Sequence, residues 1–205
     1  ALIPRVLANG TPYLEDGLPH IQMFRPALPQ GAWKPFEALP RDLDAWEMAL
    51  DRLPLDRILG VGEAGWHAGQ ITDHLAAAES ATWHYILRKT SGSAADALPL
   101  DASSDARARA LSARLRSTER FAMPEGLSQP AAPESVSALQ ALHSHRRSLA
   151  SAGRAHAASL PPAWWAVQVF KHPLAGRIGL SDTARFLADH MHHHRHQLLR
   201  LVGEE

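Results

Sequence analysis

Apolar residues recur every three or four positions in four stretches of the chain, the spacing by which an amphipathic helix buries one face. The first stretch begins near Arg41, and the others span about 66–89, 135–160 and 181–202. Their apolar stripes are Leu39, Leu43, Trp46, Leu50 and Leu53; Ile71, Leu75, Ala78, Thr82, Tyr85 and Ile86; Val136, Leu139, Leu142, Leu149 and Leu160; and Leu180, Leu187, Met191, Leu198 and Leu201. Four long helices of this kind predict an all-α fold, a four-helix bundle.

The segments between these stretches are rich in helix-breaking residues. A long connection over 91–134 separates the second helix from the third, and it contains a short predicted helix over 105–121. Residues 173–179 are predicted to form a turn that leads to Ser181, the expected N-cap of the last helix. Residues 164–170 form the one run with the composition of a strand.

The first forty residues differ from the rest because they contain seven prolines. Proline fixes the backbone φ angle and lacks an N–H donor, so it interrupts helices and sheets. Residues 1–40 are therefore expected to form an extended arm. Its apolar residues, including Trp33 and Phe36, favour an arm that packs on the helices over a disordered tail. The predicted organisation is an arm over 1–40 and a helical bundle over 41–205.

Composition and charge narrow the classes of function. The 205-residue chain has 21 basic side chains, 21 acidic side chains and no cysteine. A formal charge of zero removes the general attraction to phosphate backbones, so no nucleic-acid partner is expected. The lack of cysteine excludes disulfides, cysteine nucleophiles and thiolate metal sites within this chain. Every uninterrupted apolar run is shorter than a membrane span, which needs about 18 residues. We therefore expect a cytoplasmic protein that does not interact with membranes.

Histidine is unusually frequent, with thirteen in the chain and five of them between His190 and His196. Helical phase separates these five, because each residue advances by about 100° around the axis. His190 and His194 lie on the side of the apolar stripe, whereas His192 and His196 lie on the opposite, solvent side. Two imidazoles that project into a core need polar partners, and one metal ion bound to both would supply them.

A third ligand is expected from a facing helix. His74 lies in the apolar stripe of the second helix, next to Ala77, Ala78 and Ala81. Small side chains there would leave room for a metal ion, a water molecule and a substrate. On its own, a core histidine is more often a hydrogen-bonded structural residue than a ligand. Together with the pair on the last helix, His74 completes a predicted three-histidine metal site.

Other polar residues near these faces are candidates for contacting a substrate or a bound water. They are His67, Gln70, Tyr85 and Gln197. A structural role is the alternative for each of them. Arg146 lies near the apolar stripe of the third helix, where it could contact an anionic substrate, and extension of its charged end to solvent is the alternative. Asp73 and Asp189 precede predicted ligands and point about 100° away from them, so they are expected to be solvated.

Three segments resemble the DinB/YfiT-like superfamily, and together the resemblance covers about residues 41–203. The segment WHAGQITDHLAAAE from Trp66 is similar to the second helix of that family and places His74 at its His-Leu ligand position. The segment HPLAGRIGL from His172 is similar to the turn before the last helix. The segment FLADHMHHHRHQL from Phe186 is similar to the closing pattern, with ligands four residues apart and a nearby glutamine.

The resemblance implies a four-helix bundle in which His74, His190 and His194 bind a divalent ion, often in a homodimer. Three imidazoles suit zinc, nickel, iron or copper, and zinc or nickel is the expected ion. Characterised branches include thiol S-transferases that use bacillithiol or mycothiol, and a mycothiol-dependent isomerase. The proline-rich arm and the surplus of histidines depart from the family pattern.

Three imidazole ligands leave at least one coordination position for water or for a low-molecular-weight thiol, as in catalytic zinc sites. The expected function is a metal-dependent thiol S-transferase or hydrolase that acts on a small molecule. The alternative is a non-catalytic bundle that binds a metal or a ligand. A fourth protein ligand, such as His67 or His143, would favour that alternative.

Overall fold

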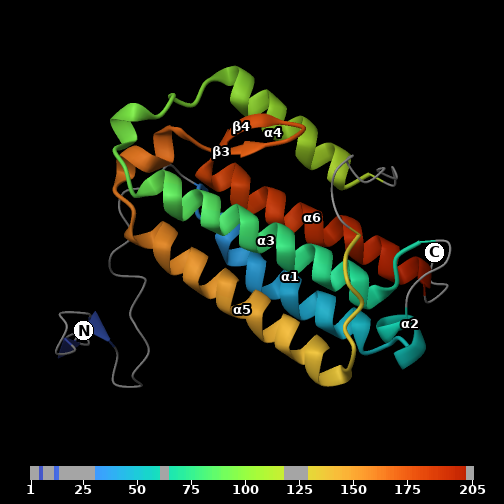
Figure 1. Ribbon diagram of the computed structural model, residues 1–205. Coiled ribbons are helices and arrows are strands. Elements are labelled where there is room, and N and C mark those ends of the chain that lie inside the picture. Colours follow the sequence, from blue (N-terminus) through green and yellow to red (C-terminus); the bar gives the residue numbers. More distant parts are fainter. Residues whose placement is uncertain (1–4, 7–11, 14–30, 61–64, 118–128, 202–205) are drawn as a thin grey trace.

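The computed structural model describes residues 5–6, 12–13, 31–60, 65–117 and 129–201, and these are mostly helical (Figure 1). In chain order the elements are β1 (Arg5–Val6), β2 (Pro12–Tyr13), α1 (Lys34–Leu50), α2 (Leu55–Leu59), α3 (Ala68–Thr90), the 3-10 helix η2 (Ala94–Asp96), α4 (Ala102–Leu115), α5 (Val136–Ser159), the 3-10 helix η3 (Pro162–Ala166), β3 (Gln168–His172), β4 (Gly176–Gly179) and α6 (Leu180–Leu201). Among the helices of these residues, none has both the length and the apolar character needed to cross a membrane.

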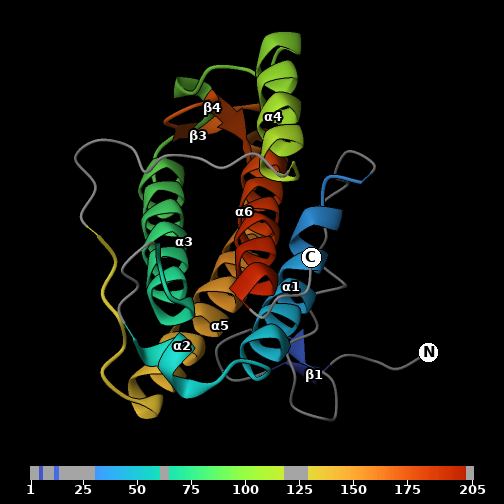
Figure 2. The ribbon, with the colours of Figure 1, turned by 90° about the vertical axis from the view of Figure 1, so that its right-hand side faces the viewer.

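The long helices α1, α3, α5 and α6 run alongside one another (Figures 1 and 2). Helix α1 packs against α5 and α6, and α3 packs against the same two helices. Helix α4 lies beside α6, where it also contacts the β3–β4 hairpin. This arrangement makes α3 and α6 neighbours, although they are far apart in the sequence.

A cluster of aromatic rings joins α1 to α3 and η3. The ring of Phe36 lies 4.8 Å from that of Trp33, 6.3 Å from that of Trp83 and 5.6 Å from that of Trp165, measured between centroids. Phe36 and Trp46 are both 0% exposed. Because each aromatic side chain buries about 150–250 Å², this cluster fixes α1 against α3, the helix that carries His74.

The prediction of an extended arm over 1–40 is wrong for residues 34–40, because α1 begins at Lys34. Pro35 is tolerated in the first turn of a helix, where the missing N–H needs no intrahelical partner. Pro40 lies inside α1 and removes one backbone hydrogen bond. The helix continues through it because Phe36 and Leu39 are buried on its inner face. The rest of the predicted arm lies outside the described residues, apart from β1, β2 and residues 31–33.

The segment before the last helix contains an antiparallel hairpin where a turn over 173–179 was expected. Strand β3 pairs with β4 through Phe170 opposite Ile178 and His172 opposite Gly176. Gly176 has a φ angle of +67°, which glycine adopts without steric cost. The hairpin leads directly into α6, so Ser181 is not an N-cap. It lies within the helix, and its hydroxyl donates a 2.8 Å hydrogen bond to the carbonyl oxygen of Ala32.

The other predicted helices agree closely with the observed ones. The expected helix over 66–89 is observed as α3, and the one over 135–160 as α5. The short helix expected over 105–121 is observed as α4, which begins three residues earlier, at Ala102, because Asp101 caps it. The Asp101 carboxylate accepts a 2.6 Å hydrogen bond from the backbone N–H of Ser104. Helix α4 ends at Leu115, and residues 118–121 lie outside the described residues.

Candidate metal centre

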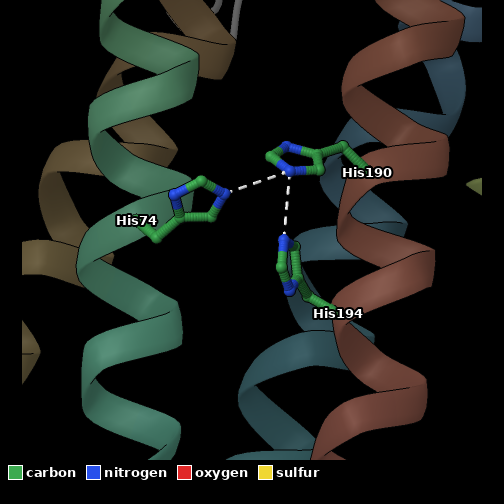
Figure 3. A group of neighbouring side chains, drawn as sticks. All are labelled: His74, His190 and His194. Atoms are coloured by element: carbon green, nitrogen blue, oxygen red, sulfur yellow. Dashed lines mark hydrogen bonds between the residues drawn. The ribbon is translucent and has the colours of Figure 1, made fainter. Parts of the chain in front are cut away.

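Three histidine side chains meet between α3 and α6 (Figure 3). His74 reaches across from α3, and His190 and His194 come from consecutive turns of α6. The Nε2 atom of His190 lies 3.2 Å from Nε2 of His74 and 3.0 Å from Nε2 of His194. One ligand atom from each of the three residues lies within 4.8 Å of the others. These three histidines therefore lie close enough to bind one metal ion.

Hydrogen bonds among the three rings cannot satisfy all of these nitrogens. A neutral imidazole nitrogen either donates one hydrogen or accepts through one lone pair. The Nε2 atom of His190 can therefore make one good hydrogen bond, but it has two nitrogen neighbours. Two nitrogens bound to the same metal ion at about 2.0–2.1 Å, with a nitrogen–metal–nitrogen angle of about 90–110°, lie about 2.9–3.4 Å apart. The observed separations of 3.0 and 3.2 Å fit a shared cation.

Burial keeps these imidazoles neutral. It lowers the pKa of His194 to about 3 and holds the pKa of His190 well below its usual value, an effect to which the neighbouring histidines add. Burial also lowers the pKa of His74. Neutral imidazole is the form that binds a metal ion, so all three rings are in the ligating protonation state near pH 7.

Gln197 fixes the tautomer of His194. Its side-chain oxygen Oε1 lies 2.7 Å from Nδ1 of His194. Because an amide oxygen only accepts, Nδ1 of His194 must carry the hydrogen, and Nε2 is left with its lone pair directed at the other two rings. The Nδ1 atom of His190 is buried without a hydrogen-bond partner in the described part of the chain. The ring of Phe186 stacks on His190 with centroids 5.5 Å apart.

The other predicted pocket residues lie in different surroundings. His67 and Gln70 are at the start of α3, where Oε1 of Gln70 accepts a 3.1 Å hydrogen bond from the backbone N–H of His67. The amide nitrogen of Gln70 donates to the carbonyl oxygen of Pro130 at 3.2 Å. Gln70 therefore secures the start of α3 and an adjacent segment. Tyr85 lies three helical turns beyond His74, and its ring packs edge-on against Phe170 at 5.4 Å.

Two expected features beside the site differ in the structure. Ala77 and Ala81 are exposed, and only Ala78 is half-buried, so the three alanines do not together line a buried pocket. His143, considered as a fourth ligand, instead lies on Glu47, with Nδ1 3.2 Å from its carboxylate. Neither His143 nor His67 belongs to the group of close metal-ligating atoms among the described residues.

Asp189 was expected to be solvated, and this was wrong. It is 0% exposed, and its carboxylate accepts hydrogen bonds from the hydroxyl of Ser112 at 2.5 Å and from Nε of Arg116 at 2.6 Å. Both partners lie at the C-terminal end of α4, so the carboxylate next to His190 attaches α4 to α6. Helical phase within α6 could not reveal this burial, because α4 causes it.

Asp73 and Arg146 also have partners that the sequence did not indicate. A carboxylate oxygen of Asp73, which precedes His74, accepts a 3.0 Å hydrogen bond from the backbone N–H of Ala131. The side chain of Arg146 does not extend to solvent. It is 0% exposed and makes two hydrogen bonds, of 2.9 and 2.7 Å, to the carboxylate of Glu79 on α3.

Comparisons with known proteins add no relative: no family model, curated protein or solved structure matches this chain. The function of the site therefore has to be inferred from the residues of this chain.

Proposed function

We propose that the chain is a DinB-like four-helix bundle whose helices are α1, α3, α5 and α6. In support, α1 and α3 each pack against α5 and α6. The connection that includes α4 separates the second and third of these helices. The segments that resemble the family lie on α3, on the β3–β4 hairpin and on α6.

The proposed function is that of a metal-dependent enzyme, a thiol S-transferase or hydrolase, with zinc or nickel held by His74, His190 and His194. The observation that carries this proposal is the convergence of three neutral Nε2 atoms, at 3.2 and 3.0 Å, from two helices. When bound, such an ion would have a coordination position free for water or a thiol and would lower the pKa of either.

The chain's own residues would prepare this site. Gln197 holds His194 in the ligating tautomer. Phe186 covers one face of the His190 ring, and the ring of Trp66 lies 5.0 Å from that of His74, so apolar surface limits the access of water. Because the chain has no cysteine, a thiol in the reaction would be supplied by the substrate or by a low-molecular-weight cofactor.

Metal content tests the site. We expect His74→Ala/His190→Ala/His194→Ala to lose the one tightly bound ion per chain that wild type retains after dialysis, measured by elemental analysis. The control is His84→Ala/His145→Ala, which removes two exposed histidines outside the site and should leave that ion in place. Unchanged metal content in the triple variant, with circular dichroism showing that it is folded, would refute the core site.

Activity distinguishes the enzyme from a non-catalytic metal-binding bundle. The metal-loaded chain is mixed with an electrophilic acceptor and a panel of low-molecular-weight thiols, including bacillithiol and mycothiol, and conjugation is followed by mass spectrometry. Hydrolysis of model esters and amides is assayed in parallel. Metal-dependent turnover that the triple variant lacks supports the proposal. A loaded site without turnover in either assay supports the binding protein.

A further inference from the structure

A second pair of histidines lies on the other side of α6 from the three-histidine centre. The Nε2 atoms of His192 and His196 are 3.0 Å apart, and their ring centroids are 4.6 Å apart. The corresponding values for His190 and His194 are 3.0 Å and 4.7 Å. The two pairs therefore have the same internal geometry, although only one of them belongs to the centre described above.

The surroundings of this second pair differ from the solvent-facing position that helical phase predicts. His192 and His196 are both half-buried. Partial burial restricts the rotamers of a side chain, so less conformational entropy remains to be lost when the two rings bind a common partner. The pair is thus partly organised for chelation before any ion arrives.

The charged groups near the pair carry one net positive charge. The charged groups that act on His192 are Arg116, Arg195 and Asp189. Arg116 is bound to the Asp189 carboxylate at 2.6 Å, which offsets much of its positive charge. A cation beside the pair therefore does not face an uncompensated arginine cluster, although Arg195 still reduces its affinity.

We propose that His192 and His196 form a second divalent-metal site, weaker than the three-histidine centre. Two imidazole nitrogens 3.0 Å apart suit adjacent ligands of an ion with metal–nitrogen bonds of about 2.0–2.1 Å. Imidazole favours zinc, nickel and copper over magnesium or calcium. The described residues offer no third side-chain ligand close to both rings, so water completes the coordination and affinity is lower.

Binding at this pair would connect consecutive turns near the C-terminal end of α6. Because a helix holds residues four apart side by side, an ion bound to both rings favours the helical conformation and opposes fraying of that end. This effect does not depend on the proposed enzymatic function, because the two sites share no ligand.

Calorimetric titration of the metal-stripped full chain with zinc tests the second site. We expect wild type to bind two ions per chain in two steps. His192→Ala/His196→Ala should lose only the weaker step, whereas the control His84→Ala/His145→Ala should keep both. Saturation of wild type at one ion, or survival of both steps in His192→Ala/His196→Ala, would overturn the proposal.

A second measurement separates the two sites from each other. In the folded His74→Ala/His190→Ala/His194→Ala variant, zinc should still raise the melting temperature, and this rise should disappear when His192→Ala and His196→Ala are added. If the triple variant does not fold, single His196→Ala in the otherwise intact chain replaces it and should remove the weaker step. Loss of the strong step in His196→Ala would instead place the tighter ion at this pair and would overturn the proposal.

Discussion

At the scale of single residues, the candidate site depends on which nitrogen of each ring carries a hydrogen. For His194 the answer is given by Gln197, whose oxygen can only accept. In metal sites, partners that orient a ligand in this way contribute strongly to affinity. Gln197, considered at first for contact with a substrate, is therefore better understood as the residue that holds one ligand in position.

Replacing Gln197 with methionine tests this role. The change keeps the approximate size of the side chain but removes the acceptor, so we expect zinc affinity at the three-histidine centre to fall by about 10–100-fold. The measurement is competition with a chromophoric chelator. The control is Gln140→Met, an exposed position on α5, which should leave the affinity unchanged. Equal affinities for Gln197→Met and wild type would contradict the assigned role.

The meeting of the three histidines could be predicted from the sequence because each position depends on local helical phase. His190 and His194 share a face of one helix, and His74 lies on the apolar stripe of another. The burial of Asp189 and the pairing of Arg146 with Glu79 could not be predicted in this way. Each depends on which helix packs alongside, and that is decided by tertiary structure.

At the scale of elements, α3 and α5 are joined by a buried ion pair. Arg146 is 0% exposed and Glu79 is 6% exposed. The next residue, Arg147, also pairs with carboxylates, those of Glu47 and Asp44 on α1, but it lies at the surface. Adjacent arginines on α5 thus provide one buried and one exposed ion pair in the same molecule.

Methionine substitutions at these two positions should have very different effects. Arg146→Met leaves the Glu79 carboxylate buried without its partner, and we expect the free energy of unfolding to fall by about 3–5 kcal/mol. Arg147→Met removes an exposed pair and should cost less than about 1 kcal/mol. Urea denaturation followed by circular dichroism measures both. Similar losses for the two variants would show that burial of the Arg146 pair is not what matters.

The positions of the elements were predictable where the apolar period was long and uninterrupted, as in α3 and α5. Prediction failed at the start of α1, where Pro35 and Pro40 suggested an arm. Burial of Phe36 and Leu39 against other helices outweighs the hydrogen bond that proline removes. The prediction was only partly right at the β3–β4 hairpin. The strand-like run over 164–170 overlaps β3, but β4 was missed, because these short strands are stabilised by pairing with each other and by packing on α3, α4 and α6.

At the scale of the whole molecule, buried neutral histidines link stability to pH. The clearest case outside the candidate metal centre is His172, whose Nδ1 accepts hydrogen bonds from the backbone N–H groups of Leu174 and Ala175 at 3.1 and 3.2 Å. Burial lowers its pKa from 6.5 to about 4. Between these values the unfolded chain binds a proton that the folded chain does not, so stability falls as pH falls.

We expect His172→Asn to reduce this acid sensitivity. Asparagine keeps an acceptor for the two N–H groups but does not titrate. Over the window from pH 6.5 to 4, the wild-type chain should lose about 3 kcal/mol more stability than the variant. Urea unfolding at several pH values, with a chelator present to exclude metal effects, measures the difference. Parallel pH profiles for the two proteins would contradict the assignment.

The three-histidine centre also has a consequence for the order in which the molecule assembles. His74 and His190 are separated by 116 positions in the sequence. A chain that has not yet formed α6 holds one of the three ligands and cannot complete the site. Contacts between such distant residues form late, after shorter-range structure has brought them together. Acquisition of the ion would therefore follow the docking of α6 against α3, and a bound ion would mark a chain whose last helix is in place.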